Sequence, residues 1–371
     1  MRSETATLPY PSPGTTRSLV RHVWGNAGTG LKVYLQGGLH ADEMPGPLAL
    51  WHLMELLDKA EAEGRLVGEV SVVPLANPIG LLQWLNDKPQ GRVELETMRN
   101  FNRGYPDLAA LAAEGLEGQL GPDAARNTAT IRAAFHAALD RVAMHSELDA
   151  LRVALMRWSH DADIVLDLHC DHVALMHFYA SSAKPKVTEA LGRATGAALA
   201  LMEDTSGGNA FDEAHTAPWR ALRARFGDRF PIEDPTFSTT LEYRGQRDVS
   251  DAIARQDAVN LVAFLGAIGA VTGAPAPVHP PAPQLPLAGA GEAFAPQGGI
   301  VSWVSEPGAM VQKGDVLGHV SDPMTRCRMD ILAPTTGLMF RRELWPFCLK
   351  GQSLAHVAGE TVIRQGDLLS D

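Results

Sequence analysis

The chain has 371 residues, which is long enough for one large domain with an ample core and a smaller second domain. Apolar residues make up 45% and charged residues 20%, as in an ordinary globular protein, and the formal net charge is −11 at pH 7. This charge argues against nucleic acid or an anionic membrane as a partner. No run reaches the ~18–20 apolar residues of a membrane span, and residues 1–16 lack the apolar region of a signal peptide. With three widely spaced cysteines, too few for a disulfide framework, we expect a reducing, cytoplasmic location.

The first two-thirds of the chain alternate strand-like and helix-like segments. Residues 31–36 (LKVYLQ) predict a strand, and residues 46–64 predict a helix with leucines at helical spacing and Pro47 in its first turn. Residues 69–77 predict a second strand, and a long helical stretch at 128–163 precedes a third strand, ADIVLDL. This alternation predicts an α/β fold with three layers, α/β/α, around a mostly parallel or mixed central sheet.

The composition changes near residue 272. Residues 272–290 are rich in Pro and Ala and predict an extended connector between a domain at 1–271 and a small all-β domain at 291–371. The Gly-punctuated β runs of this second domain resemble half of a lipoyl- or biotinyl-carrier barrel. Those carriers present a modifiable Lys beside Met, whereas this chain has Met329-Asp330. We therefore expect an unmodified barrel-like domain, and a candidate contact for a homo-oligomer.

His40 and Glu43, in GGLHADEMPG, and His169, in IVLDLHCD, form the most informative pattern. Each group follows a predicted buried strand, and ligands of open α/β sheets bind at the carboxyl ends of strands. Two His and one Glu are a zinc-ligand set that leaves a position open for water. Asp167 shares a strand face with His169, so it could accept a hydrogen bond from a ligand imidazole or from a backbone amide instead.

Asn102-Arg103, in RNFNRGYPDL, is a second signal. A guanidinium gives bidentate, charge-assisted bonds to a carboxylate and an adjacent amide adds a neutral donor. Read alone, the dipeptide fits a surface turn equally well. Its meaning depends on whether it lies beside the His-Glu-His group.

Four motifs occur in the order found in the succinylglutamate desuccinylase/aspartoacylase family, the deacylase branch of the zinc carboxypeptidase superfamily: His40-x-x-Glu43, Asn102-Arg103, Asp167-Leu168-His169 and Leu241-Glu242. The chain resembles that family over most of residues 30–260, and its C-terminal part is similar to the barrel of bacterial members. The resemblance implies one Zn²⁺ per chain, held by His40, Glu43 and His169. It also implies that Glu242 is the general base that takes a proton from the attacking water and passes it to the leaving amine.

The same resemblance implies roles for two arginines. Arg103, together with Asn102, would hold a substrate carboxylate, and an Arg upstream of this pair would stabilise the oxyanion. The spacing departs from that of aspartoacylase, since Arg92 lies ten residues before Asn102 and Arg99 only three. Arg92 is the preferred candidate and Arg99 stays open.

Some further residues have weaker signals. The Gly-rich segment 206–222 predicts a pocket loop or a plain surface loop, and its His215 could contact substrate. Arg244 and Arg247 could add positive charge or pair with nearby acids. His172 and His177 are read as pocket lining or core.

These observations favour a zinc-dependent amidohydrolase that cleaves an N-acyl amino acid or a related small, carboxylate-bearing amide. Two alternatives stay open: a zinc carboxypeptidase that acts on peptides, and a catalytically inert small-molecule binding protein on the same fold. The acyl group and the amine are not specified by any motif.

Overall fold

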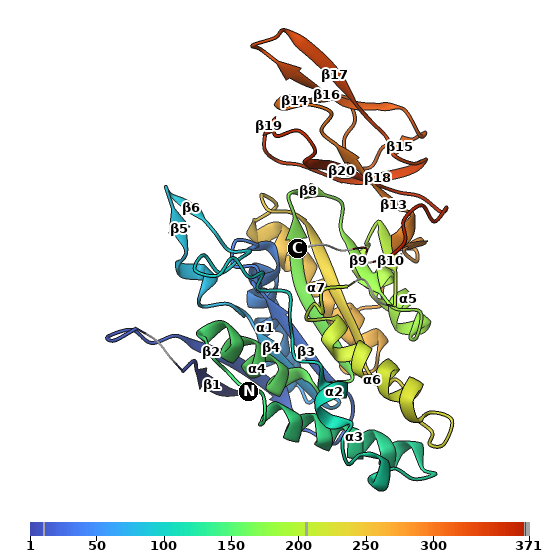
Figure 1. The fold of residues 1–371 in the computed structure, drawn as a ribbon. Helices are drawn as coiled ribbons and strands as arrows, with labels where there is room; N and C mark the ends of the chain where they lie inside the picture. The colour runs from blue at the N-terminus through green and yellow to red at the C-terminus, as the bar shows by residue number, and fades with distance from the viewer. Residues whose placement is uncertain (10–11, 205–206, 367, 369–371) are drawn as a thin grey trace.

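The computed structural model describes residues 1–9, 12–204, 207–366 and 368. Its largest element is a mixed sheet whose described part has nine strands (Figure 1). In spatial order these are β1 (Arg2–Thr7), β2 (Ser18–Gly25), β4 (Glu69–Val73), β3 (Lys32–Gly37), β7 (Ile164–Asp171), β11 (Phe237–Gly245), β9 (His177–Ala180), β10 (Leu199–Met202) and β12 (Gln284–Pro286). The central strands β4, β3, β7 and β11 are mutually parallel, whereas β9 runs antiparallel to β11. The mixed central sheet predicted from the sequence is confirmed.

Helices cover both faces of this sheet. On one face α1 (Pro45–Ala62), α5 (Pro185–Thr195) and α7 (Asp251–Ala267) pack on one another, with Leu53 and Phe264 in their shared core. The other face carries a second core that includes Phe135, Leu151 and Trp219, from the helices α2 (Leu108–Ala112), α3 (Ala124–Leu139), α4 (Glu147–Ser159) and α6 (Glu213–Phe226). The three-layer α/β/α arrangement follows. None of the helices in the described ranges is long and apolar enough to cross a membrane.

The long helical stretch expected at 128–163 is interrupted. It consists of α3, which begins earlier at Ala124, and α4, and the two helices are separated by residues 140–146. Ser146 explains the restart, because its side chain accepts a hydrogen bond from the backbone N–H of Asp149 and so caps α4. Both helices bury apolar residues in the same core, so apolar content alone does not reveal the break.

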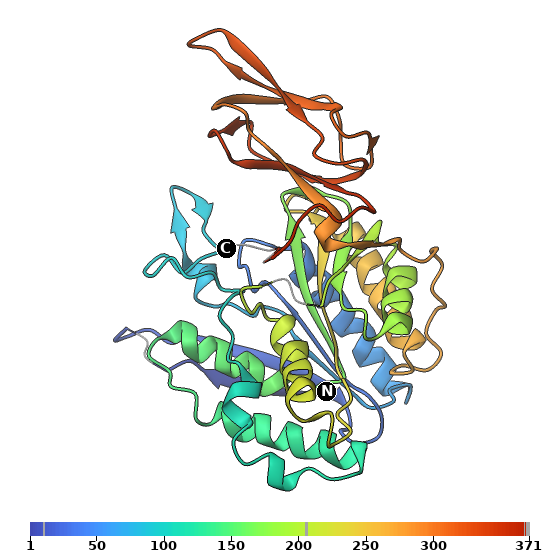
Figure 2. The ribbon, with the colours of Figure 1, turned by 45° about the vertical axis from the view of Figure 1, so that its right-hand side comes forward.

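The C-terminal part consists of two small sheets rather than a closed barrel (Figure 2). One sheet contains β13 (Ala290–Phe294), β20 (Ser353–Ala358), β18 (Gly337–Arg342) and β15 (Met310–Val311). The other contains β17 (Cys327–Leu332), β16 (Val316–Asp322), β14 (Gly299–Trp303) and β19 (Phe347–Cys348).

Two short strands join this part to the rest of the molecule. Within residues 272–290, β12 pairs in parallel with β10 and extends the large sheet. In return β8 (Val173–Ala174), which directly follows β7, pairs with β18. The C-terminal sheets therefore lie at the end of the large sheet where β7 runs into β8 (Figures 1 and 2). A hairpin of β5 (Trp84–Leu85) and β6 (Lys88–Pro89) also reaches them, because Lys88 Nζ lies 4.8 Å from the Trp345 ring centroid.

Along β3, β7 and β11, the residues on one face of the sheet change from apolar to polar toward the carboxyl ends of the strands, and the candidate site lies at that end. Tyr34 and Val165 face the core beneath α3, α4 and α6. Two residues further along, on the same face, the sheet presents a row of Gln36, Asp167 and Thr240. The next row pairs His169 with Glu242 at the carboxyl ends of the strands.

Candidate metal centre

The loop between β3 and α1 carries His40 and Glu43. The chain leaves β3 through Gly38, and the backbone N–H of Glu43 donates to the His40 carbonyl at 3.1 Å, so the two side chains share one tight turn. Helix α1 then begins at Pro45, and Gly46 lies directly against β7. A Cβ atom on Gly46 would stand 2.7 Å from the Leu168 Cβ, so the close approach of the helix to the strand of His169 requires glycine.

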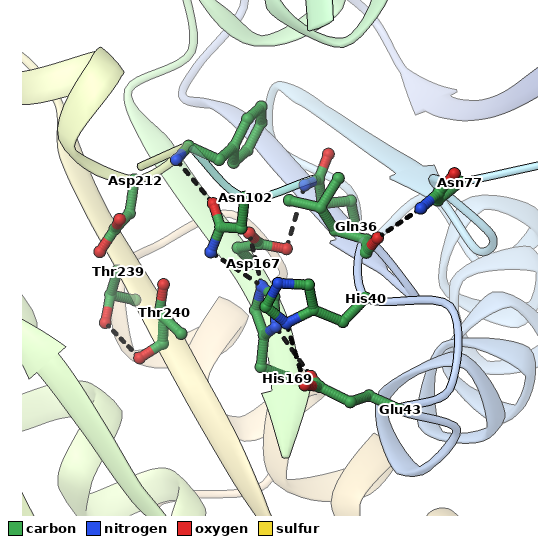
Figure 3. Close-up of polar contacts among 12 residues, drawn as sticks. Gln36, His40, Glu43, Asn77, Asn102, Asp167, His169, Asp212, Thr239 and Thr240 are labelled. Carbon is green, nitrogen blue, oxygen red and sulfur yellow. Dashed lines mark hydrogen bonds and ion pairs between the residues drawn. The ribbon is translucent and has the colours of Figure 1, made fainter. Parts of the chain in front are cut away.

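His40, Glu43 and His169 point toward one another (Figure 3). Nδ1 of His40 lies 3.0 Å from one Glu43 oxygen, and Nδ1 of His169 lies 2.8 Å from the other. The backbone N–H of Cys170 also donates to Glu43, at 3.0 Å. All three residues are buried: the most exposed of them, Glu43, has an exposed fraction of 6%. Their ligand atoms lie within 4.8 Å of one another.

Hydrogen bonds on the far side of each ring select the nitrogen that faces Glu43. Nε2 of His169 donates to Oδ2 of Asp167 at 2.9 Å, and Nε2 of His40 donates to Oδ1 of Asn100 at 3.0 Å. The Asn100 oxygen also accepts from the backbone N–H of Asn102, which fixes the orientation of the amide. With both Nε2 atoms engaged as donors, the Nδ1 atoms of the two rings face the Glu43 carboxylate, and these are the nitrogens that a bound cation would use.

This donor set fits a divalent transition metal. Two imidazole nitrogens and a carboxylate oxygen are ligands that Zn²⁺ accepts in catalytic sites, where a fourth position is left open. Metal-binding histidines ordinarily donate their second N–H to a carboxylate or carbonyl, as both rings do here. The three side chains thus have the donor atoms that a three-ligand metal site requires, and these atoms lie close together.

The charges of the cluster are strongly coupled. Burial favours the neutral form of Glu43, but the imidazoles of His40 and His169 hold the pKa of its carboxyl below the ordinary value. Burial also disfavours the charged form of His169, but the carboxylates of Asp167 and Glu43 raise its pKa well above the ordinary value. A bound cation and a proton compete for Nδ1 of His169, so metal binding displaces that proton.

Glu242 lies beside the cluster on the neighbouring strand. It is in register with His169 on β7 and with His177 on β9, and its Oε2 is buried without a hydrogen-bond partner in the described part of the chain. Burial, together with the charges of Asp171 and Glu43, raises the pKa of the Glu242 carboxyl well above the ordinary value. The side chain lines the cavity next to the His-Glu-His cluster. A carboxyl in this position can exchange protons with a molecule in the cavity.

The Asn102-Arg103 pair lies at the same cavity. The side-chain oxygen of Asn102 accepts from the backbone N–H of Phe211 at 2.8 Å, which turns the amide nitrogen toward Nε2 of His169, 3.4 Å away. Arg103 is held against the loop after Ser206, since the backbone N–H of Gly104 donates to the Gly208 carbonyl. The surface-turn interpretation of this dipeptide does not fit its location.

Arg92 and Arg99 are separated clearly by the structure. The chain doubles back between them, so that the Phe101 N–H donates to the Arg92 carbonyl and Arg92 comes to line the cavity beside Asn102. Gly91 lies against the loop that carries His40 and Glu43: a Cβ there would stand 2.1 Å from the Asp42 nitrogen. Arg99 instead donates to Asp149 at 3.0 Å, with 44% of its side chain exposed.

The cavity beside the cluster has a volume of about 590 Å³. Its walls come from both parts of the molecule, including Tyr179 and Asp212 from the part that contains the large sheet and Phe340 and Arg341 from β18. The volume lies within the range of small-molecule sites, ~300–1,000 Å³. The C-terminal sheet therefore forms part of the wall around any molecule that binds next to the His-Glu-His cluster.

The weaker candidates fall outside the reactive part of the site. His215 is buried, with its ring between the Phe211 carbonyl and the Ser159 hydroxyl, and Ser206 of the same segment lies outside the described residues. Arg244 pairs with Asp257. His177 is buried, and His172 pairs with Glu343 at 2.8 Å.

Sequence reasoning missed some residues that hold the site. Gln36 donates to Asp167 at 3.0 Å and Asn100 orients His40. A polar Gln36 in an otherwise apolar strand was an available signal, as was the alternation of Asn100 with Asn102. Arg341 and Glu343 gave no signal, because their contacts with β7 and the residue after it cross more than 160 positions of sequence.

A mixed α/β sheet with this cluster and cavity at the carboxyl ends of its strands fits a hydrolase. The model of the succinylglutamate desuccinylase/aspartoacylase catalytic domain matches residues 29–221, more than half of the chain. The chain belongs to this family. No curated protein matches it significantly.

Solved structures share the fold over nearly the whole chain. A succinylglutamate desuccinylase/aspartoacylase family protein from Shewanella amazonensis is 24% identical, with a TM-score of 0.82 over 96% of this chain and 98% of that one. A similar protein from Shewanella frigidimarina is 23% identical, with a TM-score of 0.81 over 96% of each chain. The ectoine utilization protein EutE (DoeB) from Ruegeria pomeroyi is 18% identical, with a TM-score of 0.67 over 96% of this chain and 95% of that one. At these identities the likeness shows the fold.

Proposed function

We propose that this protein is a zinc-dependent amidohydrolase that removes the acyl group from an N-acyl amino acid or a related small amide bearing a carboxylate. The observation that carries the proposal is the convergence of Nδ1 of His40, Nδ1 of His169 and the Glu43 carboxylate, with Glu242 in register beside them. The family membership supports the same reaction class. One zinc ion per chain is expected at these three side chains.

When bound, zinc supplies Lewis acidity, which polarises the amide carbonyl and makes water a nucleophile near neutral pH. The chain supplies the proton transfers. Glu242 accepts a proton from the attacking water and delivers it to the amide nitrogen, which leaves as an amine. The buried position of Glu242 raises the pKa of its carboxyl, which makes the carboxylate a stronger base toward the attacking water.

The remaining groups bind and orient the substrate. Arg103 takes a substrate carboxylate, and the amide nitrogen of Asn102 adds a second donor between that carboxylate and the cluster. Arg92, which lines the same cavity, stabilises the negative charge that develops on the carbonyl oxygen. The C-terminal sheet limits the volume available, which favours a small amide over a long peptide.

The Glu242→Gln variant tests this function. Zinc content, measured by plasma mass spectrometry, should stay at about one ion per chain, whereas hydrolysis of a panel of N-acyl amino acids should be lost. Glu55→Gln serves as the control, because Glu55 lies on the outer side of α1 with 66% of its side chain exposed. Turnover retained by Glu242→Gln would remove Glu242 as the base.

A peptide panel tests the two alternative functions. A carboxypeptidase would cleave the C-terminal residue of unblocked tri- and tetrapeptides faster than it deacylates N-acetyl or N-succinyl amino acids. An inert binding protein would hold zinc and hydrolyse neither set. Preference for the N-acyl amino acids over the peptides is the outcome that we expect.

A further inference from the structure

Two ion pairs of opposite polarity join the C-terminal sheet to the end of the strand that carries His169. Arg341, on β18, lies 2.9 Å from Oδ1 of Asp171, and Glu343, just after β18, lies 2.8 Å from Nδ1 of His172. Backbone pairing continues the contact, since Arg341 is opposite Ala174 on β8. The C-terminal sheet is thus attached within two residues of a metal ligand.

Asp171 is the critical member of this junction. It lies on the same face of β7 as Asp167 and His169, and only 12% of its side chain is exposed. Its second oxygen stands 3.4 Å from Nε2 of His177, which is in register with Glu242. Asp171 therefore places a second buried carboxylate close to the carboxyl that we assign as the base.

Arg341 faces this group of acids from the opposite domain. Its guanidinium lines the cavity with 30% of the side chain exposed, and the charges of Asp171, Glu242 and Glu343 all act on it. A buried carboxylate without a positive partner is costly and repels other carboxylates nearby. The Arg341–Asp171 pair removes this repulsion at the place where a negative Glu242 must work.

We propose that Arg341 is a positioning residue of the active site, which fixes and neutralises Asp171 so that the end of β7 keeps His169 and Glu242 in their working arrangement. The inference rests on the proposed function for its kinetic consequences. It makes the C-terminal sheet a part of the catalytic machinery, in addition to a wall of the cavity. Arg341 acts through Asp171 and does not bind the substrate carboxylate, because the acids around it disfavour a second anion.

The neighbouring residue offers a matched control. Arg342 has the same chemistry and strand, but it points to the other face and pairs with Glu306 of its own domain at 2.8 Å. We therefore compare Arg341→Gln, Arg342→Gln and the double variant Asp171→Asn/Arg341→Gln in the full-length protein. Each is measured for zinc content, thermal unfolding midpoint, kcat and KM on the best N-acyl amino acid.

Arg341→Gln should keep its zinc and lose at least tenfold in kcat, with KM changed less than threefold, while Arg342→Gln should match the wild type. The double variant should recover most of kcat, because it also removes the unpaired charge. A selective rise of KM without rescue would show that Arg341 binds substrate, and a lower unfolding midpoint with unchanged kcat would show a purely structural role. Either outcome overturns the proposal.

Cobalt-loaded protein separates this inference from the proposed function. If the wild type hydrolyses no amide, the proposed function fails, but the visible absorption of bound Co²⁺ still reports the geometry of its ligands. Arg341→Gln should then change that spectrum, the double variant should restore it, and Arg342→Gln should leave it as in the wild type. Identical spectra in all four proteins would refute the positioning role.

Discussion

Nε2 of His169 donates a 2.9 Å hydrogen bond to Asp167, two residues earlier on the same strand. Asp167 is fully buried, and its other oxygen accepts from Gln36, whose own oxygen accepts from the Tyr34 hydroxyl at 2.9 Å. This chain of hydrogen bonds extends from the hydrophobic core to the candidate metal site. The sequence left open whether Asp167 accepts a hydrogen bond from an imidazole or from a backbone amide, and in the structure it accepts one from the His169 imidazole.

Replacing Asp167 with Asn should therefore weaken metal binding. The neutral amide keeps the shape of the side chain but loses the charge that orients the ring and increases the basicity of Nδ1, so zinc affinity should fall about 10- to 100-fold. Competition with a chromophoric chelator measures this. Asp161→Asn is the control, since Asp161 pairs with Lys32 at the other end of the sheet. Equal affinities in Asp167→Asn and the wild type would exclude the supporting role.

The two arginines upstream of Asn102 should differ in their effect on catalysis. Arg92→Ala should reduce kcat about 10²- to 10³-fold, the usual cost of removing one oxyanion donor. Arg99→Ala should stay within about twofold of the wild type, because Arg99 pairs with Asp149 away from the cavity. Steady-state kinetics on one N-acyl amino acid tests both. A larger loss in Arg99→Ala than in Arg92→Ala would reverse the assignment.

The sequence predicts the site best where the signal is local to a strand end. Because the carboxyl ends of parallel strands share one edge, His40, Glu43 and His169 could be brought together without a structure. The position of Arg92 could not, because it depends on a loop that folds back over ten residues and on the contact of Gly91 with Asp42. The number of residues between Arg92 and Asn102 does not reveal that the loop between them folds back.

The same limit applies to the fold. Short apolar runs predicted β3, β4 and β7, which are buried along almost their whole length, and helical spacing of leucines predicted α1. These patterns could not predict that β8 joins the C-terminal sheet while β12 joins the large one. Those pairings are set by tertiary contacts, and a two- or three-residue strand has no period of its own.

Arg103→Ala should raise KM mainly for substrates with a carboxylate. The reason is that the substrate carboxylate would lose its charge-assisted pair with the guanidinium, whereas the metal site and Glu242 would be untouched. We expect KM for an N-acyl amino acid to rise at least tenfold and KM for its carboxamide to change little. Arg103→Lys should restore only part of the loss, since an ammonium lacks the planar fork. A similar KM increase for both substrates would argue against a carboxylate clamp.

His215 should make the protein sensitive to mild acid. Burial lowers the pKa of this histidine to about 4, although the hydrogen bond between its ring and the Phe211 carbonyl acts in the opposite direction. In the unfolded chain the pKa is ~6.5, so between these two values the unfolded state binds the extra proton. The contribution of His215 to the free energy of unfolding is fully present above pH ~6.5 and declines as the pH falls toward 4. The loss is about 2–3 kcal/mol, at ~1.4 kcal/mol per pKa unit.

The variant that isolates this effect is His215→Gln, which keeps a hydrogen-bonding side chain but cannot titrate. Other buried histidines also respond to acid: the pKa values of His160 and His177 are lowered by burial, and that of His169 is raised by its carboxylates. The comparison is therefore the difference in unfolding free energy between variant and wild type, measured with urea on chelator-treated protein at pH 7 and 4.5. The wild type should lose more stability than His215→Gln over this interval. Parallel losses would mean that His215 is already protonated in the folded protein, or that its site admits water.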